Sequence, residues 1–411
     1  MKRRVVITGM GAVTPVGNDV DSMWKAIKNG ENGIDFIKQF DTSNLKIKIA
    51  GEVKDLDPSL YLTPREYRKL DRAILFALVS ATQAYNNANL EGAEINRDRF
   101  GTFVSSGIGG LGTINSEGKK AYEKGADRVS PFFIPNAIIN LIGGNIAIKF
   151  KAYGPALPVV TACSAGTNAI GEAYRYIKDN YIDIAFAGGS EAAINELGIG
   201  GFTTMRALNT TNDPNKASIP FDKRRSGFVM AEGAGILILE ELEHAKARGA
   251  KIYGEIVGYN TTCDAFHITA PDESARGITL CIENALKEAN ISPEAIDYIN
   301  PHGTSTIYND RLETLGIKNV FKDHAYNINI GATKSMTGHA LGAIGAIEAI
   351  ITVKAIEEGI VPPTINYVEK DEECDLNYTP NKAVKRNINY AMSNSLGFGG
   401  QNASLVFKKY K

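Results

Sequence analysis

The feature that most constrains the fold is an internal repetition, in which two parts of the chain carry the same succession of short apolar strands and apolar helices. The first part opens with a strand at 4–8, and the second opens with a strand at 252–258. Strands that alternate with helices predict α/β layers. We therefore expect two similar α/β halves, 1–251 and 252–411. The other matching pairs are 100–107 with 296–303, the helix after Cys163 with the helix after His339, and the strands 184–189 and 234–239 with 390–395 and 403–407.

Cys163 lies at a predicted junction between a strand and a helix. The apolar run 156–160 predicts a buried strand, and apolar residues at helical spacing between 169 and 177 predict a helix that begins near Ser164. A thiol at the start of a helix lies near free backbone N–H groups and the positive end of the helix dipole, which lower its pKa. Cys163 is therefore a candidate nucleophile, although a small buried side chain is the alternative for this segment alone.

Two of the five histidines stand in loops rich in glycine and hydroxyl residues. His302 follows a short apolar strand and precedes the run Gly303-Thr-Ser-Thr. His339 ends a loop that also contains Lys334, directly ahead of an apolar helix at 340–356. A cysteine and distant histidines that meet only in the folded chain are typical of thiol enzymes. This pattern favours a catalytic role over a structural one for both histidines.

Six short motifs follow one another along almost the whole chain. They are Arg4-Val-Val-Ile-Thr-Gly-Met-Gly-Ala-Val-Thr-Pro, Thr161-Ala-Cys-Ser, Pro220-Phe-Asp, His302-Gly-Thr-Ser-Thr, Thr333-Lys-Ser-Met-Thr-Gly-His and Ser393-Asn-Ser-Leu-Gly-Phe-Gly-Gly. Through them the chain resembles the β-ketoacyl-[acyl-carrier-protein] synthases of fatty-acid synthesis, and among these the type II elongating enzymes. The resemblance implies a duplicated, thiolase-like fold of five α-β-α-β-α layers. Its N-terminal half would carry Cys163, and its C-terminal half would carry both histidines.

The resemblance also implies the reaction, a decarboxylative condensation of malonyl-[acyl-carrier protein] with a fatty acyl chain held on Cys163. The product would be a 3-oxoacyl-[acyl-carrier protein]. The backbone N–H groups of Cys163 and Phe398 would stabilise the oxyanion of acyl transfer. His302 and His339, as neutral imidazoles, would stabilise the enolate that remains after loss of carbon dioxide. No metal or organic cofactor is implied, because the decarboxylation itself drives the condensation.

The same resemblance gives other residues supporting roles. Lys334 and Glu313 would form an ion pair that orients the histidine loops, although a merely structural pair is the alternative. Ile108 would lie along the acyl tunnel, near Phe202 and behind a gate formed by Phe398. The alternative for Ile108 is a packing residue between the layers.

A basic stripe is predicted on a helix that begins at Thr63. The sequence Thr63-Pro-Arg-Glu predicts a capping box with proline at the first helical position. Arg65, Arg68, Lys69 and Arg72 then recur at helical spacing, opposite an apolar face. The resemblance implies that Arg65, Arg68 and Lys69 dock an acidic acyl carrier protein, whereas an ordinary solvated face is the alternative. Homodimer formation is implied by the resemblance alone.

Several positions depart from the pattern of the family. They are Pro301, the pair Ile307-Tyr308, Leu396, Gln401 and Ser226. The first three stand where the family usually has Ala, Pro-Leu and Phe. None of these departures removes a reacting group, so we expect them to affect fine specificity rather than the chemistry.

Composition and charge exclude several classes of protein. The chain has 45 lysine and arginine residues against 46 acidic residues, so no strong charge favours nucleic acid. The four cysteines, at 163, 263, 281 and 374, form no Cys-x-x-Cys pair and indicate a reducing compartment. Glu348 and Lys354 interrupt the longest apolar helix, which argues against a membrane span. With no apolar signal sequence at the start, we expect a cytoplasmic protein.

Three other functions were weighed. Gly107-Ile-Gly-Gly-Leu-Gly matches a nucleotide-binding pattern, but no acidic residue ends a strand about 20 residues later, so a reductase is disfavoured. A thiolase would need a second cysteine near the C-terminus, and 393–402 contains none. A non-catalytic carrier-binding relative would be expected to lack Cys163.

Overall fold

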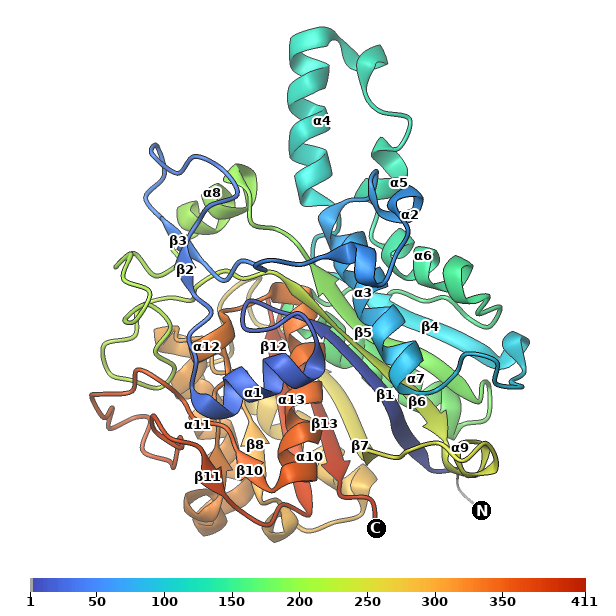
Figure 1. Ribbon diagram of the computed structural model, residues 1–411. Helices are drawn as coiled ribbons and strands as arrows, with labels where there is room; N and C mark the ends of the chain where they lie inside the picture. Colours follow the sequence, from blue (N-terminus) through green and yellow to red (C-terminus); the bar gives the residue numbers. More distant parts are fainter. Residues whose placement is uncertain (1–2) are drawn as a thin grey trace.

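Nine strands form one hydrogen-bonded sheet in the computed structural model, which describes residues 3–411 (Figure 1). Their order across the sheet is β4-β5-β6-β1-β7-β13-β12-β8-β9. Two short ribbons, β2 (Asp35–Phe36) with β3 (Ile49–Ala50) and β10 (Ile360–Val361) with β11 (Val384–Lys385), lie outside this sheet. The nine strands are β1 (Val5–Val13), β4 (Phe100–Ser105), β5 (Ile184–Glu191), β6 (Gly233–Glu241), β7 (Gly254–Cys263), β8 (Tyr298–Asn300), β9 (Asn329–Ile330), β12 (Tyr390–Gly397) and β13 (Gln401–Lys408).

The sheet consists of two equivalent wings that meet where β1 pairs with β7. Outward from this pair, β6, β5 and β4 follow on one side, and β13, β12 and β8 follow on the other, where β9 is added at the edge. The directions match as well, because β4–β5 and β8–β12 are parallel while β5–β6 and β12–β13 are antiparallel. The duplication expected from the sequence is therefore confirmed. The boundary between residues 251 and 252 stays a prediction.

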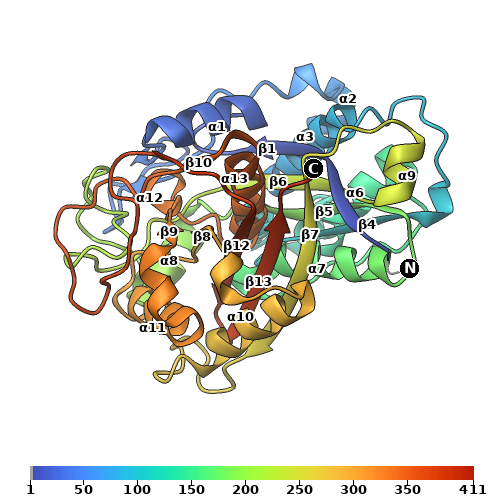
Figure 2. The same ribbon diagram turned by 90° about the horizontal axis from the view of Figure 1, so that it is seen from below.

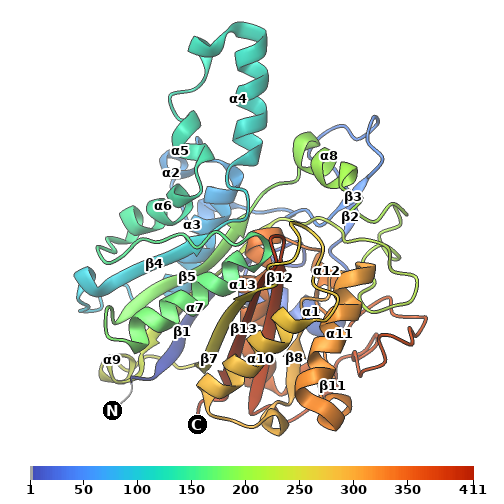
Figure 3. The same cartoon turned by 180° about the vertical axis from the view of Figure 1, so that it is seen from behind.

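Helices form three layers around the two wings. In the middle layer, α7 (Ala165–Lys178) and α13 (Ile344–Glu358) contact strands of both wings. On the outside, α3 (Arg72–Asn87) and α6 (Asn140–Phe150) cover the first wing, and α10 (Arg276–Ala289) covers β7 and β13 of the second (Figures 2 and 3). The arrangement is the predicted α-β-α-β-α succession. The remaining α-helices are α1 (Val20–Asn29), α2 (Pro64–Tyr67), α4 (Leu111–Lys124), α5 (Phe133–Ala137), α8 (Glu196–Thr204), α9 (Leu242–Ala247), α11 (Ile307–Phe321) and α12 (Lys334–Thr337).

The middle layer brings the starts of α7 and α13 together. Every residue of α13 from Ile344 to Ile356 is buried, as expected for a helix that is apolar on all sides. A Cβ at Gly166, in the first turn of α7, would lie 2.9 Å from the carbonyl oxygen of Gly342 and 3.0 Å from the nitrogen of Ala346. Glycine at this position thus permits a close approach between the two helix starts, and this contact lies next to the functional cavity described below.

Two local predictions, a strand at 156–160 and one continuous basic helix after Thr63, were wrong. The run 156–160 is not a strand, since only Ala156 makes an isolated bridge, and Leu157 and Val160 are 41% and 49% exposed. Pro155 and Pro158 lack the N–H groups that a strand needs for its ladder. Elsewhere, α4 projects beyond the rest of the molecule, and α5 lies beside α2 near the foot of this projection (Figure 1). Among residues 3–411, none of the helices is long and apolar enough to cross a membrane.

The predicted basic helix is divided into two. The capping box is present, with the carboxylate of Glu66 accepting the Thr63 N–H at 2.7 Å, but α2 ends at Tyr67 and α3 begins at Arg72. The carboxylate of Asp71 caps α3 by accepting the N–H of Ala73 at 2.9 Å, and this new start breaks the helix.

Candidate active site

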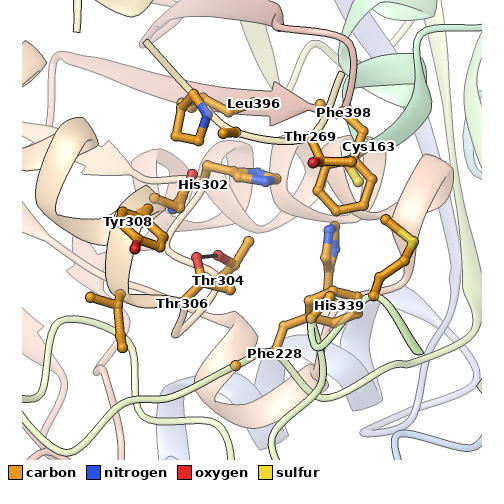
Figure 4. A pocket seen from close by; sticks show the side chains of 18 of the residues that line it. Cys163, Phe228, Thr269, His302, Thr304, Thr306, Tyr308, His339, Leu396 and Phe398 are labelled. Atoms are coloured by element: carbon orange, nitrogen blue, oxygen red, sulfur yellow. Dashed lines mark hydrogen bonds between the residues drawn. The ribbon is translucent and has the colours of Figure 1, made fainter. Parts of the chain in front are cut away.

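A cavity of about 830 Å³ collects side chains from both wings (Figure 4). Cys163 enters it from the start of α7, and His302 from the loop after β8. His339 comes from the loop after α12, and Phe398 from the turn between β12 and β13. The three candidate reacting groups, far apart in the sequence, are thus brought together in one place.

Cys163 occupies a tight 3₁₀ turn, Ala162–Ser164, immediately before α7. Ala162 has φ +50°, a left-handed conformation that costs an alanine about 1–3 kcal/mol. The second wing repeats the turn at Leu341–Ala343 before α13, where Leu341 has φ +45°. Such strain turns the chain sharply and presents the thiol to the cavity. The predicted junction is therefore present, with a turn in place of the strand.

The β12–β13 hairpin is fixed against the Cys163 turn. The Ser164 hydroxyl donates to the carbonyl of Gln401 at 2.7 Å, and a Cβ at Gly397 would lie only 2.7 Å from the carbonyl oxygen of Thr161. The tip of the hairpin therefore lies beside the nucleophile. As a result, the backbone N–H groups of Phe398 and Cys163 face the sulfur and favour its thiolate.

The expected lowering of the thiol pKa is wrong for the resting protein. Burial raises the pKa of Cys163 to about 12, and this effect outweighs the opposing charge of Lys334 and the two N–H groups. The carboxylate of Glu191 raises the pKa further. The thiol is thus protonated at neutral pH and must lose its proton as it reacts.

His302 and His339 face each other across the cavity (Figure 4). Their ring centroids are 5.3 Å apart, with the planes almost perpendicular at 86°. Burial lowers the pKa of both imidazoles well below 6.5, and the charge of Lys334 lowers it further. Both rings are therefore neutral at pH 7, which agrees with the expectation from the sequence. Within the described chain, the Nδ1 atoms of both rings are buried without a hydrogen-bond partner.

The expected ion pair between Lys334 and Glu313 is not formed. Both oxygens of Glu313 accept backbone N–H groups, from His302 at 2.7 Å and from Gly303 at 2.8 Å. Glu313 is buried, and burial raises the pKa of its carboxyl to about 7. It therefore positions the backbone of the His302 loop.

The partner of Lys334 is Glu348 on α13, whose two oxygens lie 2.7 and 2.9 Å from the ammonium nitrogen. Both side chains are buried, and burial raises the pKa of Glu348 to about 7. Sequence reasoning missed this role of Glu348. An acidic residue within an apolar helix was the available signal, because a buried carboxylate requires a partner.

Phe202 and Ile108 lie differently with respect to the cavity. Phe202 lines it, with its ring centroid 6.4 Å from that of Phe398 and 5.5 Å from that of Phe228. Ile108 packs against the apolar cluster that contains Cys163, but it is not among the residues that line the cavity. Its place along an acyl tunnel stays a prediction.

Most positions that depart from the family pattern line the cavity. These are Ser226, Ile307, Tyr308 and Leu396, whereas Pro301 and Gln401 do not. Sequence reasoning did not assign the hydroxyl groups of Thr269, Thr304 and Thr306, which also line it. The cavity wall is therefore where this chain differs most from the pattern of its motifs.

Three of the four residues of the predicted basic stripe are exposed on the surface. Arg65, Arg68 and Lys69 are exposed on and just after α2. Arg72 instead forms an ion pair with the buried carboxylate of Glu232, at 2.6 Å, and is a structural residue. The ammonium group of Lys69 lies 5.0 Å from the centroid of the Phe132 ring.

Comparison with known proteins gives consistent matches over the chain. Residues 2–245 match the family model described as β-ketoacyl synthase, N-terminal domain, and residues 253–368 match that of the C-terminal domain. A 3-oxoacyl-[acyl-carrier-protein] synthase 2 of Synechocystis sp. is 51% identical over 411 residues, covering 100% of this chain and 99% of the relative. The protein of the same name from Coxiella burnetii is 50% identical over 409 residues, with 99% coverage of both.

Solved structures agree with these matches. A β-ketoacyl synthase from Burkholderia phymatum superposes with a TM-score of 0.93 at 33% identity, covering 100% of both chains. A chain from a complex described as a type II polyketide synthase acyl-carrier protein with its ketosynthase gives a TM-score of 0.92 at 35% identity, again covering 100% of both chains.

Proposed function

Because this chain belongs to the β-ketoacyl synthase family, we propose that it is a 3-oxoacyl-[acyl-carrier-protein] synthase, an acyltransferase that elongates fatty acids by decarboxylative condensation. The observation that carries the proposal is the convergence of one thiol and two neutral imidazoles in a single cavity. The following steps assign the residues that perform the reaction.

In the first step Cys163 takes the acyl group from its carrier. The sulfur attacks the thioester carbonyl, and the N–H groups of Cys163 and Phe398 stabilise the negative oxygen of the tetrahedral intermediate. The bond from the carbonyl carbon to the carrier sulfur then breaks, and the proton lost by Cys163 goes to the departing carrier thiolate. Lys334 assists electrostatically, because its charge favours the thiolate form of Cys163.

In the second step malonyl carrier protein enters the cavity and loses carbon dioxide. The electron pair of the broken carbon–carbon bond moves into the thioester as an enolate. Neutral His302 and His339 donate N–H groups to the enolate oxygen, a role that imidazoles with lowered pKa can fill without first losing a proton. The enolate carbon attacks the acyl carbonyl, the bond from that carbon to the sulfur of Cys163 breaks, and the thiolate takes up a proton from solvent.

Glu313, Lys334 and Glu348 act on this site through their neighbours. Glu313 holds the backbone of His302, and Glu348 holds Lys334 at the depth where its charge acts on the thiol and both imidazoles. Removing Lys334 or Glu348 would leave the charge of the other residue buried without a partner, which typically lowers the free energy of unfolding by about 3–5 kcal/mol.

The activity is tested by incubating the protein with acyl- and malonyl-loaded acyl carrier protein. We expect 3-oxoacyl carrier protein and carbon dioxide in equal amounts, detected by mass spectrometry and gas release. Omission of the acyl primer should leave at most slow malonyl decarboxylation. A protein that forms no 3-oxoacyl product with primers of any length would contradict the proposed function.

The partner we propose is an acidic acyl carrier protein docked on Arg65, Arg68 and Lys69. Reversing two of these charges, with Arg65→Glu and Arg68→Glu, should raise KM for carrier-bound substrate, and the effect should shrink as salt is added. Turnover of a small pantetheine thioester should hardly change. Equal losses on both substrates, or the same KM change in a control carrying Lys322→Glu and Lys382→Glu, would contradict docking at this stripe.

Acyl chain length should depend on Ile108 if this residue borders the tunnel. Ile108→Phe overpacks the site, which typically costs about 1–3 kcal/mol, and about 1.4 kcal/mol corresponds to tenfold in rate. We therefore expect kcat/KM for long primers to fall by roughly 10- to 100-fold, while short primers remain nearly unaffected. Elongation rates against primer length would show this difference, whereas parallel losses at all lengths would identify Ile108 as a core residue.

We further propose that the protein works as a homodimer in the cytoplasm. The projecting region and its neighbourhood expose many large apolar side chains, an arrangement typical of protein–protein interfaces. They include Tyr122, Phe132, Ile134, Ile138, Ile148, Tyr153, Leu157 and Val160. The four cysteines are free, which agrees with a reducing compartment. A monomeric mass in sedimentation equilibrium at micromolar concentration would contradict the dimer.

A further inference from the structure

Glu191, the last residue of β5, is fully buried beside the Cys163 turn. Its carboxylate makes no salt bridge to any residue that the structure describes. Four donors surround it instead. Oε1 accepts the hydroxyl of Ser106 at 2.7 Å and the N–H of Ile108 at 3.3 Å, and Oε2 accepts the N–H groups of Gly107 at 2.7 Å and Gly342 at 3.0 Å.

These donors belong to two separate turns. One is the turn 106–109 after β4, which Ser106 tightens by accepting the N–H of Gly109 at 2.8 Å. The other is the 3₁₀ turn that follows His339 and contains Gly342. The turns fit closely, since a Cβ at Gly342 would lie 2.1 Å from the nitrogen of Gly107 and 2.9 Å from Oε2 of Glu191. The carboxylate therefore joins the segment that carries Ile108 to the segment that carries His339.

Burial raises the pKa of Glu191, whereas the hydrogen bonds from Ser106, Gly107, Gly342 and Ile108 act in the opposite direction and favour the carboxylate form. Each oxygen accepts at least one backbone N–H, so a glutamine amide in either orientation would direct its NH₂ group at another donor. The charge of Glu191 also acts on the thiol of Cys163. Glu191 on β5 raises the pKa of the Cys163 thiol, whereas Lys334 on α12 lowers it; the imidazoles of His302 and His339, which line the same cavity, are neutral.

We propose that Glu191 is a positioning residue of the condensing site, which holds the Ile108 turn against the turn after His339 and places a negative charge beside the nucleophile. This inference rests on the proposed roles of Cys163 and Ile108. Glu191 touches no substrate in this account and acts only through the segments that it joins. Its loss should therefore change both the selection of acyl length and the reactivity of the thiol.

The test compares Glu191→Gln with the wild-type protein in two measurements. Elongation of long primers should fall about tenfold or more in kcat/KM, because the Ile108 turn loses its anchor, with a smaller loss for short primers. Alkylation of Cys163 by iodoacetamide at pH 8, followed by peptide mass spectrometry, should be at least about threefold faster, because the thiolate fraction rises as the pKa falls. The buried Cys281 and Cys374 should stay unmodified, which shows that the variant is folded.

Two further variants separate the possible causes. Ser106→Ala removes one donor to the Glu191 carboxylate, and the acceptor of the Gly109 N–H, but keeps the charge, so it should lower the long-primer rate without accelerating alkylation. Glu255→Gln replaces a buried carboxylate on β7 that pairs with Arg4, which precedes β1, and should change neither measurement.

A wild-type long-primer rate in Glu191→Gln, or unaccelerated alkylation of its Cys163, would overturn the inference. If that variant does not fold, an unchanged long-primer rate in Ser106→Ala would overturn it instead. Failure of the proposed function would be visible separately, because Cys163 of the wild-type protein would then not be acylated at all.

Discussion

Replacing Cys163 with alanine should abolish both acyl-enzyme formation and condensation, while malonyl decarboxylation stays measurable. The reason is a division of labour within the cavity, in which the sulfur accepts the acyl group and the two imidazoles stabilise the enolate. Intact-protein mass spectrometry after incubation with acyl carrier protein would detect the acyl adduct, and gas release from malonyl carrier protein would measure decarboxylation.

A matched replacement of another buried thiol serves as the control. Cys281→Ala removes a free, buried cysteine that lies outside the cavity, and it should leave acylation intact. A Cys163→Ala protein that still carries one acyl group would show that another residue is the nucleophile.

His302→Ala and His339→Ala should have the opposite effect, with decarboxylation lost and some acylation of Cys163 retained. Removal of one hydrogen-bond donor from a developing oxyanion typically costs about 10²–10³ in rate, and we expect a loss of this size for each variant. Carbon dioxide release, measured separately from acyl-adduct formation, would resolve the two effects. The control His324→Ala removes an imidazole that is hydrogen-bonded to the carbonyl of Ile296 and does not line the cavity, and it should retain the wild-type rate.

The lowered pKa of both imidazoles also predicts the pH dependence of this step. An ordinary imidazole becomes protonated as pH falls through about 6.5, and a donor that must stay neutral would then change its charge. Because the pKa values of His302 and His339 lie well below 6.5, both rings stay neutral there. Burial raises the pKa of Glu313 and Glu348 to about 7, so any change in the decarboxylation rate between pH 8 and pH 6.5 should follow these carboxyls. The imidazole C–H resonances of His302 and His339 in the Cys163→Ala protein should not shift over this range, and a titration of either ring centred near pH 6.5 would contradict neutral imidazoles.

The sequence predicted the features that depend on local pattern. The paired strands of the two wings are buried apolar runs, so their correspondence could be read directly from the chain, whereas their order across the sheet was not predicted. The cysteine and histidine motifs stand at ends of such elements, which is why the structure brings them into one cavity. Local pattern also predicted the capping box at Thr63.

What the sequence did not predict depends on contacts through space. Glu348 meets Lys334 only because α13 packs against the start of α12, and no spacing between positions 334 and 348 reveals that contact. The direction of the thiol pKa was wrong because burial, a property of the packed layers, outweighs the local field at the start of α7. The charge states of buried groups can therefore be predicted only when their surroundings in the folded chain are known.

The repeated turn before α7 and α13 has a consequence for the chemistry of the two wings. Ala162 and Leu341 share the left-handed conformation, so Cys163 corresponds to Gly342. At Gly342 a Cβ would overlap the nitrogen of Gly107 at 2.1 Å, which leaves no room for any side chain. One copy of the junction is open and reactive, and the other is sterically closed. A near-symmetric scaffold is in this way restricted to a single nucleophile, and moving the cysteine to the second junction would disrupt the packing before it created a second site.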